Sequence, residues 1–197
     1  MLRNFILVIL CLALLPNTQI KAECENTFVT RAELADAVMK TYEYITQEFS
    51  FPIIEQSVFN DISDSSFQFR ILQAHIKGIM NGVGDDKFLP DKELTRCEAA
   101  VAVYRLTKCI NEKYNLTLEE KKVDISDIET SPDWGKEAIM FTVSVNIMTT
   151  EQSKFYPERL ITQNELNEIT DMIKDIFVVC DDVERIDFQT FLERISP

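Results

Sequence analysis

Apolar residues recur at spacings of three and four along most of the chain, as in amphipathic helices. The apolar positions after Thr30 are Leu34, Val38, Tyr42, Ile45 and Phe49, and those after Thr95 are Ala99, Ala100, Val103, Leu106 and Ile110. Similar stripes predict helices within residues 66–80, 134–145 and 166–176, and a last one at 183–195. The intervening segments 50–57 and 111–122 are not rich enough in Gly, Pro or Ser to separate independently moving domains. The pattern therefore predicts an all-α fold.

A Thr-x-x-Glu box begins three of these stripes, at residues 30–33, 95–98 and 162–165. In such a box the threonine side chain accepts a hydrogen bond from the backbone three residues on, and the glutamate accepts one from the threonine N–H. Each box therefore predicts the start of a helix. The boxes are almost evenly spaced along the chain, and this near-constant spacing indicates an internal repeat.

The residues around the boxes also repeat. The sequence Asp-Ile-Ser-Asp at 61–64 recurs at 124–127. The aromatic and proline positions recur at a slightly larger interval, and they are Phe67 with Trp134, Phe88 with Phe155, and Pro90 with Pro157. Four additional residues within 128–133 would account for the difference between the two intervals. The repeat unit is thus an Asp-rich turn, an aromatic-led helix, a loop, Phe-x-Pro, a box and a second helix.

The segment 1–22 has the proportions of a signal peptide, with Arg3 early, an apolar run from Phe5 to Leu15 and a polar end at Ala22. That run is too short to span a bilayer comfortably. We expect export and cleavage after Ala22, which leaves residues 23–197 as a single domain. An uncleaved N-terminal anchor is the alternative.

The chain is strongly acidic, with 33 Asp and Glu against 20 Lys and Arg and a net charge of −13. This balance disfavours nucleic acid and anionic membranes as partners. It also opposes an anionic polymer unless basic residues gather in one groove. The single histidine, His75, lies on an apolar stripe, and no nucleophile and base stand at a recognisable spacing, so we expect neither an enzyme nor a cofactor.

Four cysteines remain after the leader, at Cys24, Cys97, Cys109 and Cys180. Cys97 and Cys109 lie on one predicted helix, about 18 Å apart along its axis. A disulfide needs Cα atoms within roughly 7 Å, so these two cannot pair. Either Cys24–Cys97 with Cys109–Cys180, or Cys24–Cys109 with Cys97–Cys180, stays open, as do free buried thiols.

The middle repeat resembles the S-layer homology (SLH) repeat. The resemblance rests on the sequences Phe-Asn-Asp-Ile at 59–62, Gly-Ile-x-x-Gly-x-Gly-Asp at 78–85, Phe-x-Pro at 88–90 and Leu-Thr-Arg-Cys-Glu at 94–98. Residues 59–110 match a full unit, 123–178 a degenerate unit and 28–49 only the latter half of one. The resemblance implies a pseudo-three-fold arrangement of helix pairs around a central bundle, with grooves between neighbouring units.

The resemblance also implies a glycan site. It assigns Arg31 and Arg96 to an acidic sugar, and assigns Gly82, Gly84, Asp85 and Trp134 to the walls of the groove. The first-turn position of both arginines supports this, because the N–H groups and dipole of a helix N-terminus already favour an anion. Each residue also has a plainer explanation: a surface ion pair for the arginines, a tight turn for the glycines and core packing for Trp134. Acids near Asp85 do not form an EF-type loop, so we expect no metal.

Departures from the family pattern limit how many grooves bind. The third box has Gln163 in place of arginine, and its loop at 148–152 lacks both glycines. We therefore expect an exported, non-catalytic module that binds secondary cell-wall polysaccharide or peptidoglycan-linked glycan at the cell wall, the cell surface or in the periplasm. The alternative is a degenerate SLH scaffold that assembles with an envelope protein and has lost glycan binding.

Overall fold

The computed structural model describes residues 27–49 and 58–177, and in these ranges the regular structure is helical. The helices are α3 (Arg31–Thr46), α4 (Gln68–Ile76), α5 (Arg96–Tyr114), a 3₁₀ turn η1 (Ile128–Thr130), α6 (Asp133–Ser144) and a helix at 163–177. Extended segments within these ranges meet only in isolated bridges. The all-α prediction is confirmed, whereas the predicted leader and the predicted helix at 183–195 lie outside the described residues.

All three boxes start their helices as predicted. The Oγ1 atoms of Thr30, Thr95 and Thr162 accept from the backbone N–H three residues on, at 3.3, 3.2 and 3.3 Å. The carboxylates of Glu33, Glu98 and Glu165 accept from the threonine N–H groups at 2.8, 3.0 and 3.0 Å. Both α3 and α5 end on a left-handed residue, Gln47 and Asn115 respectively. Because α5 continues to Tyr114, the first part of the predicted linker at 111–122 is helical.

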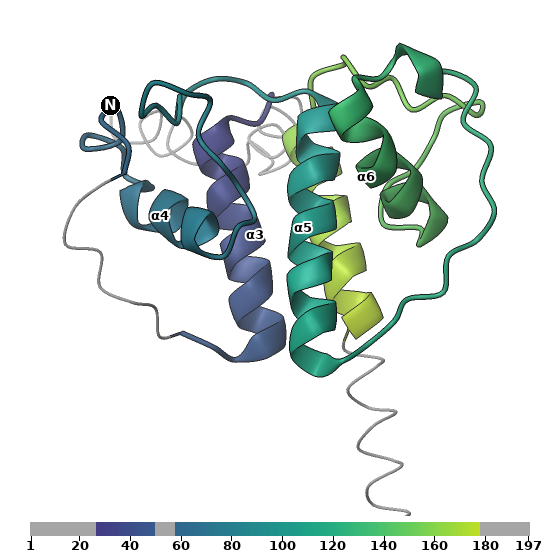
Figure 1. The fold of residues 1–197 in the computed structure, drawn as a ribbon, viewed down its shortest axis with the longest axis horizontal. Helices are drawn as coiled ribbons and strands as arrows, with labels where there is room; N and C mark the ends of the chain where they lie inside the picture. The colour runs from purple at the N-terminus through teal and green to yellow at the C-terminus, as the bar shows by residue number, and fades with distance from the viewer. Residues whose placement is uncertain (1–26, 50–57, 178–197) are drawn as a thin grey trace, which may run out of the picture.

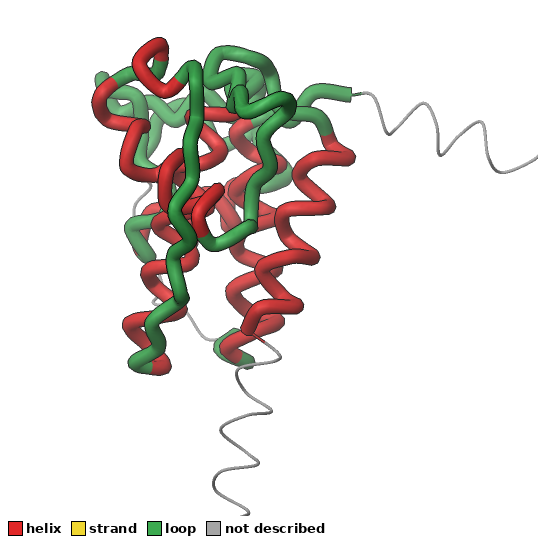
Figure 2. Tube along the Cα trace, turned by 90° about the vertical axis from the view of Figure 1, so that its right-hand side faces the viewer, coloured by secondary structure: helices red, strands yellow, loops and turns green. Residues whose placement is uncertain are grey.

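The segments that precede the three boxes hold one another in a closed cycle. The Val29 N–H donates to the Ile161 carbonyl, the Ile161 N–H donates to Leu94, and the Leu94 N–H donates to Val29, each at 3.0 Å. The long helices α3, α5 and 163–177 therefore begin side by side at one end of the molecule (Figure 1). Most loops gather at this same end (Figure 2).

The shorter helices lie outside these long ones and pack on the preceding repeat. Helix α4 packs against α3, and α6 packs against α5 (Figure 1). The largest fully buried side chains come from the helices, from both Phe-x-Pro segments and from the turns between them, and they include Tyr42, Ile62, Ile71, Phe88, Leu106, Ile139 and Phe155. Because each repeat buries its apolar face against its neighbour, the repeats form one core. A pseudo-three-fold arrangement of helix pairs stays a prediction at the level of the whole chain.

The structure corrects the register of the Asp-rich turns. Asp61 accepts from the N–H groups of Phe88 and Leu89 at 2.9 and 2.8 Å, and Asp127 accepts from Phe155 and Tyr156 at 2.8 Å. The counterpart of Asp61 is therefore Asp127, and the alignment of 61–64 with 124–127 is wrong. The predicted insertion of four residues is wrong as well, and a single additional residue makes up the difference. The repeated letters misled because the Asp-Ile pair occurs at both 124–125 and 127–128.

Candidate functional site: grooves between the repeats

Arg31 connects the first repeat to the loop of the second. Its Nε atom donates to the Phe88 carbonyl at 2.6 Å and its Nη2 atom to the Asn81 carbonyl at 2.7 Å. The guanidinium carbon also lies 4.6 Å from the centre of the Phe88 ring, a cation–π contact. Burial lowers the pKa of Arg31, although Glu98 and Asp61 oppose the shift, and an arginine keeps its charge in any case.

Arg96 makes the same contacts one repeat later. Its Nε and Nη2 atoms donate to the carbonyls of Phe155 and Thr149 at 2.9 and 2.7 Å, and its guanidinium carbon lies 4.6 Å from the Phe155 ring centre. Its Nη1 atom pairs with Glu165. Burial lowers the pKa of Arg96, and the charge of Glu165 is the largest opposing effect. Each box arginine thus holds the Phe-x-Pro loop of the following repeat in place.

The first-turn N–H groups of α3 and α5 are occupied within the protein. The N–H groups of Arg31 and Ala32 donate to Lys92 and Pro90, both at 2.9 Å, and that of Arg96 donates to Arg159 at 2.8 Å. The prediction that these N–H groups are open to an anion is therefore wrong. The sequence could not reveal this, because the acceptors lie in the next repeat, far along the chain.

Gln163, which stands at the arginine position of the third box, connects that box to the first repeat through its backbone. Its N–H donates to the Thr27 carbonyl at 2.9 Å, and its side chain donates to Asn167 at 3.2 Å. The next repeat in the cycle is the first, and the sequence has no Phe-x-Pro loop before Thr30 for an arginine to hold. The change from arginine to Gln163 is thus explained by packing between repeats.

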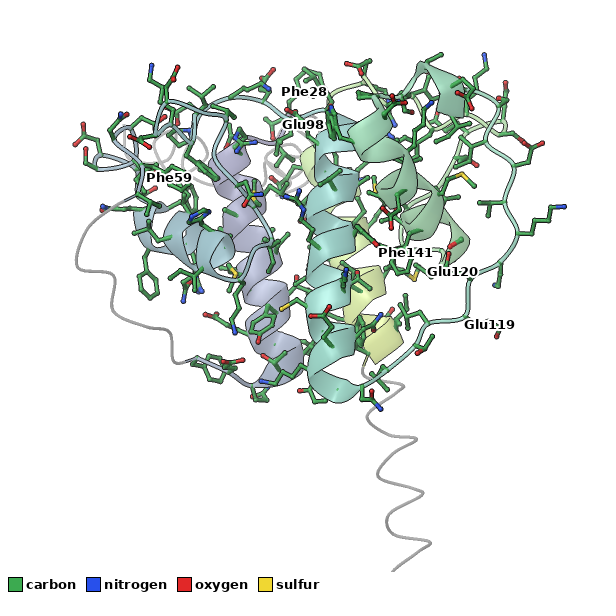
Figure 3. All side chains as sticks on the ribbon, in the orientation of Figure 1. Phe28, Phe59, Glu98, Glu119, Glu120 and Phe141 are labelled. Carbon is green, nitrogen blue, oxygen red and sulfur yellow. The ribbon has the colours of Figure 1, made fainter. Side chains whose placement is uncertain are left out.

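Among the described residues, three grooves follow the three long helices at equivalent positions of the repeat. The first groove, of about 320 Å³, lies between α3, the second-repeat loop, α5 and α6, and its polar or aromatic lining residues are Arg31, Asn81, Glu98, Arg105 and Trp134. Glu98 lies near the upper end of α5 (Figure 3). Trp134, which the sequence left between core and groove, is 61 % exposed. This groove brings together three of the predicted site residues, which are Arg31, Gly82 and Trp134.

The second groove, of about 540 Å³, contains Arg96 and is strongly acidic. Its carboxylates are Glu151, Glu165, Glu168, Asp171 and Asp175. The third groove, of about 260 Å³, carries two carboxylates, Glu33 and Asp36, and two lysines, Lys40 and Lys174. The three grooves therefore differ in charge although the repeat makes them equivalent in position, and the first is the one with more cations than carboxylates.

The loop glycines have different local roles. A Cβ atom at Gly82 would lie 2.6 Å from the Phe59 ring and 2.7 Å from the Lys87 carbonyl oxygen, so close packing requires glycine there. Gly84 has a φ of 108° and Asp85 a φ of 51°, and neither lines any of the three grooves. The third-repeat loop closes with the same hydrogen bond, from the Lys154 N–H to the Glu151 carbonyl at 2.9 Å, but only Gln152 and Ser153, and not Glu151, have a positive φ there. A tight turn explains Gly84 and Asp85.

Sequence reasoning missed Arg105. It lies two helical turns beyond Glu98 on the same face of α5, and the two side chains share the first groove. No ion pair of Arg105 is found among residues 27–49 and 58–177. Extending the groove-facing positions from the box at spacings of three and four would have found it.

Cys97 and Cys109 form no disulfide within the described residues, and Cys97 is buried against α6. Burial, helped by Glu158 and Glu98, raises the pKa of the Cys97 thiol to about 11, so it is a poor nucleophile. Cys24 and Cys180, the other half of both predicted pairings, lie outside the described residues. Within the described part, no three His, Cys, Asp or Glu side chains are grouped so that they could share a metal ion.

Comparison with known proteins agrees with the repeat. The model of the S-layer homology domain family matches residues 58–100, which contain the second-repeat turn, loop and box. Residues 58–100 are therefore an S-layer homology domain, and domains of this class attach proteins to cell-wall polymers at the cell surface without catalysis. No curated protein sequence matches the chain. In the described ranges, no helix has both the length and the apolar character needed to cross a membrane.

Proposed function

We propose that this chain is an exported module that binds an acidic cell-wall glycan through the first groove. One observation carries the proposal: Arg31, Arg105 and the exposed Trp134 line the same groove. Two guanidinium groups offer charge to a carboxylate, and an indole ring can stack on the face of a sugar. Arg31 contributes a fixed charge, because its Nε and Nη2 atoms already hold the loop.

The carboxylate in the first groove has partners of its own. Glu98 accepts from the Lys92 ammonium at 2.9 Å and from the Thr95 N–H at 3.0 Å. Burial would raise the pKa of Glu98, but these hydrogen bonds and the charges of Lys92 and Arg31 lower it. Its negative charge is therefore offset locally, which leaves the two arginines to attract an anion.

The second groove is a poor site for an acidic glycan. Five carboxylates surround one arginine, and that arginine is already paired with Glu165, whereas Arg31, which is also buried, shares its groove with a second arginine. We therefore place the glycan at Arg31 rather than Arg96. Gly82 shapes the groove wall, whereas Gly84 and Asp85 support the loop from outside the groove.

Co-sedimentation with purified wall sacculi tests this function. The chain should sediment with intact sacculi and stay in solution with sacculi stripped of their attached polysaccharide. Trp134→Ala, which changes an exposed side chain, should lower the bound fraction several-fold by removing the stacking surface. Equal binding to intact and stripped sacculi would contradict the proposal.

The alternative function is an assembly module at the envelope. The acidity of the second groove favours it, because an acidic surface suits a basic protein segment better than an acidic glycan. Absence of binding to either sacculus preparation, together with binding to a protein partner, would support this alternative.

A further inference from the structure

The second groove combines an apolar floor with an acidic rim. Its apolar lining residues are Ile147, Met148 and Ile169, which are buried, and Met172, which is half-buried; this groove has the largest volume of the three. A methionine-containing apolar surface adapts to side chains of different shapes. Met172 thus offers this groove an accessible apolar side chain, whereas the first groove contains two arginines.

The carboxylates of the second groove are spread along its length. Four of them, Glu165, Glu168, Asp171 and Asp175, lie on the helix at 163–177, and the first and last are about 15 Å apart along the helix axis. Glu151 faces them from the loop of the same repeat. In the described part of the chain no three of these side chains converge well enough to share a metal ion. An extended cationic ligand suits this spacing better than a single ion.

Two of these carboxylates form no ion pair within the described ranges. Glu165 pairs with Arg96 and Arg159, Glu151 pairs with Arg159, and Asp171 pairs with Lys174. Glu168 and Asp175 have no such partner in the described part of the chain, and both side chains are exposed. Their charges are therefore available to a partner.

We infer that the second groove docks a basic, amphipathic segment of a partner protein. Lysine or arginine side chains of that segment would pair with Glu168 and Asp175, and an apolar side chain between them would pack on Met172. An extended segment rises about 3.3 Å per residue, so roughly five residues would span the carboxylates. The inference concerns a groove other than the glycan site, and either can hold without the other.

Selection from a random twelve-residue peptide display library on the immobilised full chain tests the inference. Enriched peptides should carry lysine or arginine on both sides of an apolar residue. A selected peptide should bind the variant Glu168→Gln/Asp175→Asn roughly five-fold more weakly, the loss expected for two exposed ion pairs.

The matched control is Asp85→Asn/Asp86→Asn, which removes the same charge from exposed positions outside the second groove. Asparagine also suits the positive φ values of 51° and 52° at these two positions. The control should bind the peptide like the unchanged chain. Equal losses in both variants, or no enrichment of basic peptides, would overturn the inference. Tighter binding of a chitosan hexamer than of the peptides would assign the groove to a cationic glycan and would also overturn it.

Discussion

Arg31 and Arg96 occupy equivalent positions of the repeat and make the same contacts. Their surroundings nevertheless differ, so the two arginines are not equally able to bind an anionic ligand. Both guanidinium groups hold two loop carbonyls and lie over a phenylalanine ring. Arg31 shares its groove with Arg105, while Arg96 shares its groove with five carboxylates. The motif arginine is thus first a packing residue, and the neighbouring side chains decide whether its charge can serve a ligand.

Replacement of Arg31 by methionine should lower the free energy of unfolding by about 2–3 kcal/mol, because two loop carbonyls lose a charged donor. The equivalent change in the third box, Gln163→Met, should cost less than about 0.5 kcal/mol, since that side chain hydrogen-bonds to Asn167 on its own helix and holds no loop carbonyl among the described residues. Urea denaturation of both variants measures the difference. Similar losses would show that the arginine does not hold the loop.

The Cys97 side chain leaves no room for a side chain at position 135, which is glycine. A Cβ atom at Gly135 would lie 2.3 Å from the Cys97 Sγ atom, so Gly135→Ala should destabilise the protein by about 1–3 kcal/mol through overpacking. In a Cys97→Ala background the same change should be neutral or stabilising, because alanine favours a helix over glycine by up to about 1 kcal/mol. A double-mutant cycle from thermal unfolding checks this coupling. Additive effects would contradict the close contact.

At the scale of elements, helix starts were predictable and relations between repeats were not. The capping boxes at Thr30, Thr95 and Thr162 fix helix starts through contacts only three residues apart, so a local pattern contains the information. The loop that each box arginine holds lies in another repeat, and no local pattern encodes that contact. The two other errors have local causes: Arg105 follows Glu98 on the same face of α5, and the Asp-Ile pair at both 124–125 and 127–128 misled the register of the Asp-rich turns.

A charged cluster joins the far ends of three helices. Glu48 accepts from the Tyr42 hydroxyl, from Lys113 at 2.9 Å and from Lys77 at 3.3 Å, and so connects α3, α5 and the end of α4. Hydrogen bonds from Tyr42 and Lys113 lower the pKa of Glu48 to about 2. A carboxylate whose pKa is lower in the folded state stabilises the protein above its unfolded pKa and loses this contribution as the pH falls through the folded pKa.

The contribution of Glu48 should therefore be complete above about pH 4.5 and disappear as the pH falls towards 2. Because this side chain is one-third exposed, we expect it to contribute about 1 kcal/mol. Denaturation of Glu48→Gln and of the unchanged chain between pH 2 and 6 measures this contribution. The two stability curves should converge at low pH; a constant separation down to pH 2 would contradict the assignment.

At the scale of the whole molecule, the described parts of the repeats close on one another and form three grooves of different charge at equivalent positions. The cycle through Val29, Leu94 and Ile161 sets the long helices side by side, and this brings side chains from separate repeats into the first groove. The all-α class and the repeat could be predicted from the sequence. The charge of each groove could not, because it depends on which side chains the packing of the repeats brings together. An acidic chain can thus present one groove in which arginines outnumber carboxylates.

The most direct test of the account compares Arg105→Gln with Lys108→Gln. Both changes remove one positive charge from α5, but only Arg105 lines the first groove. The measurement is the dissociation constant of each variant for polysaccharide-bearing wall sacculi at physiological ionic strength. We predict binding about ten-fold weaker for Arg105→Gln, as expected for the loss of one charged hydrogen bond, and unchanged binding for Lys108→Gln. Equal affinities of the two variants would contradict the assignment of the first groove as the glycan site.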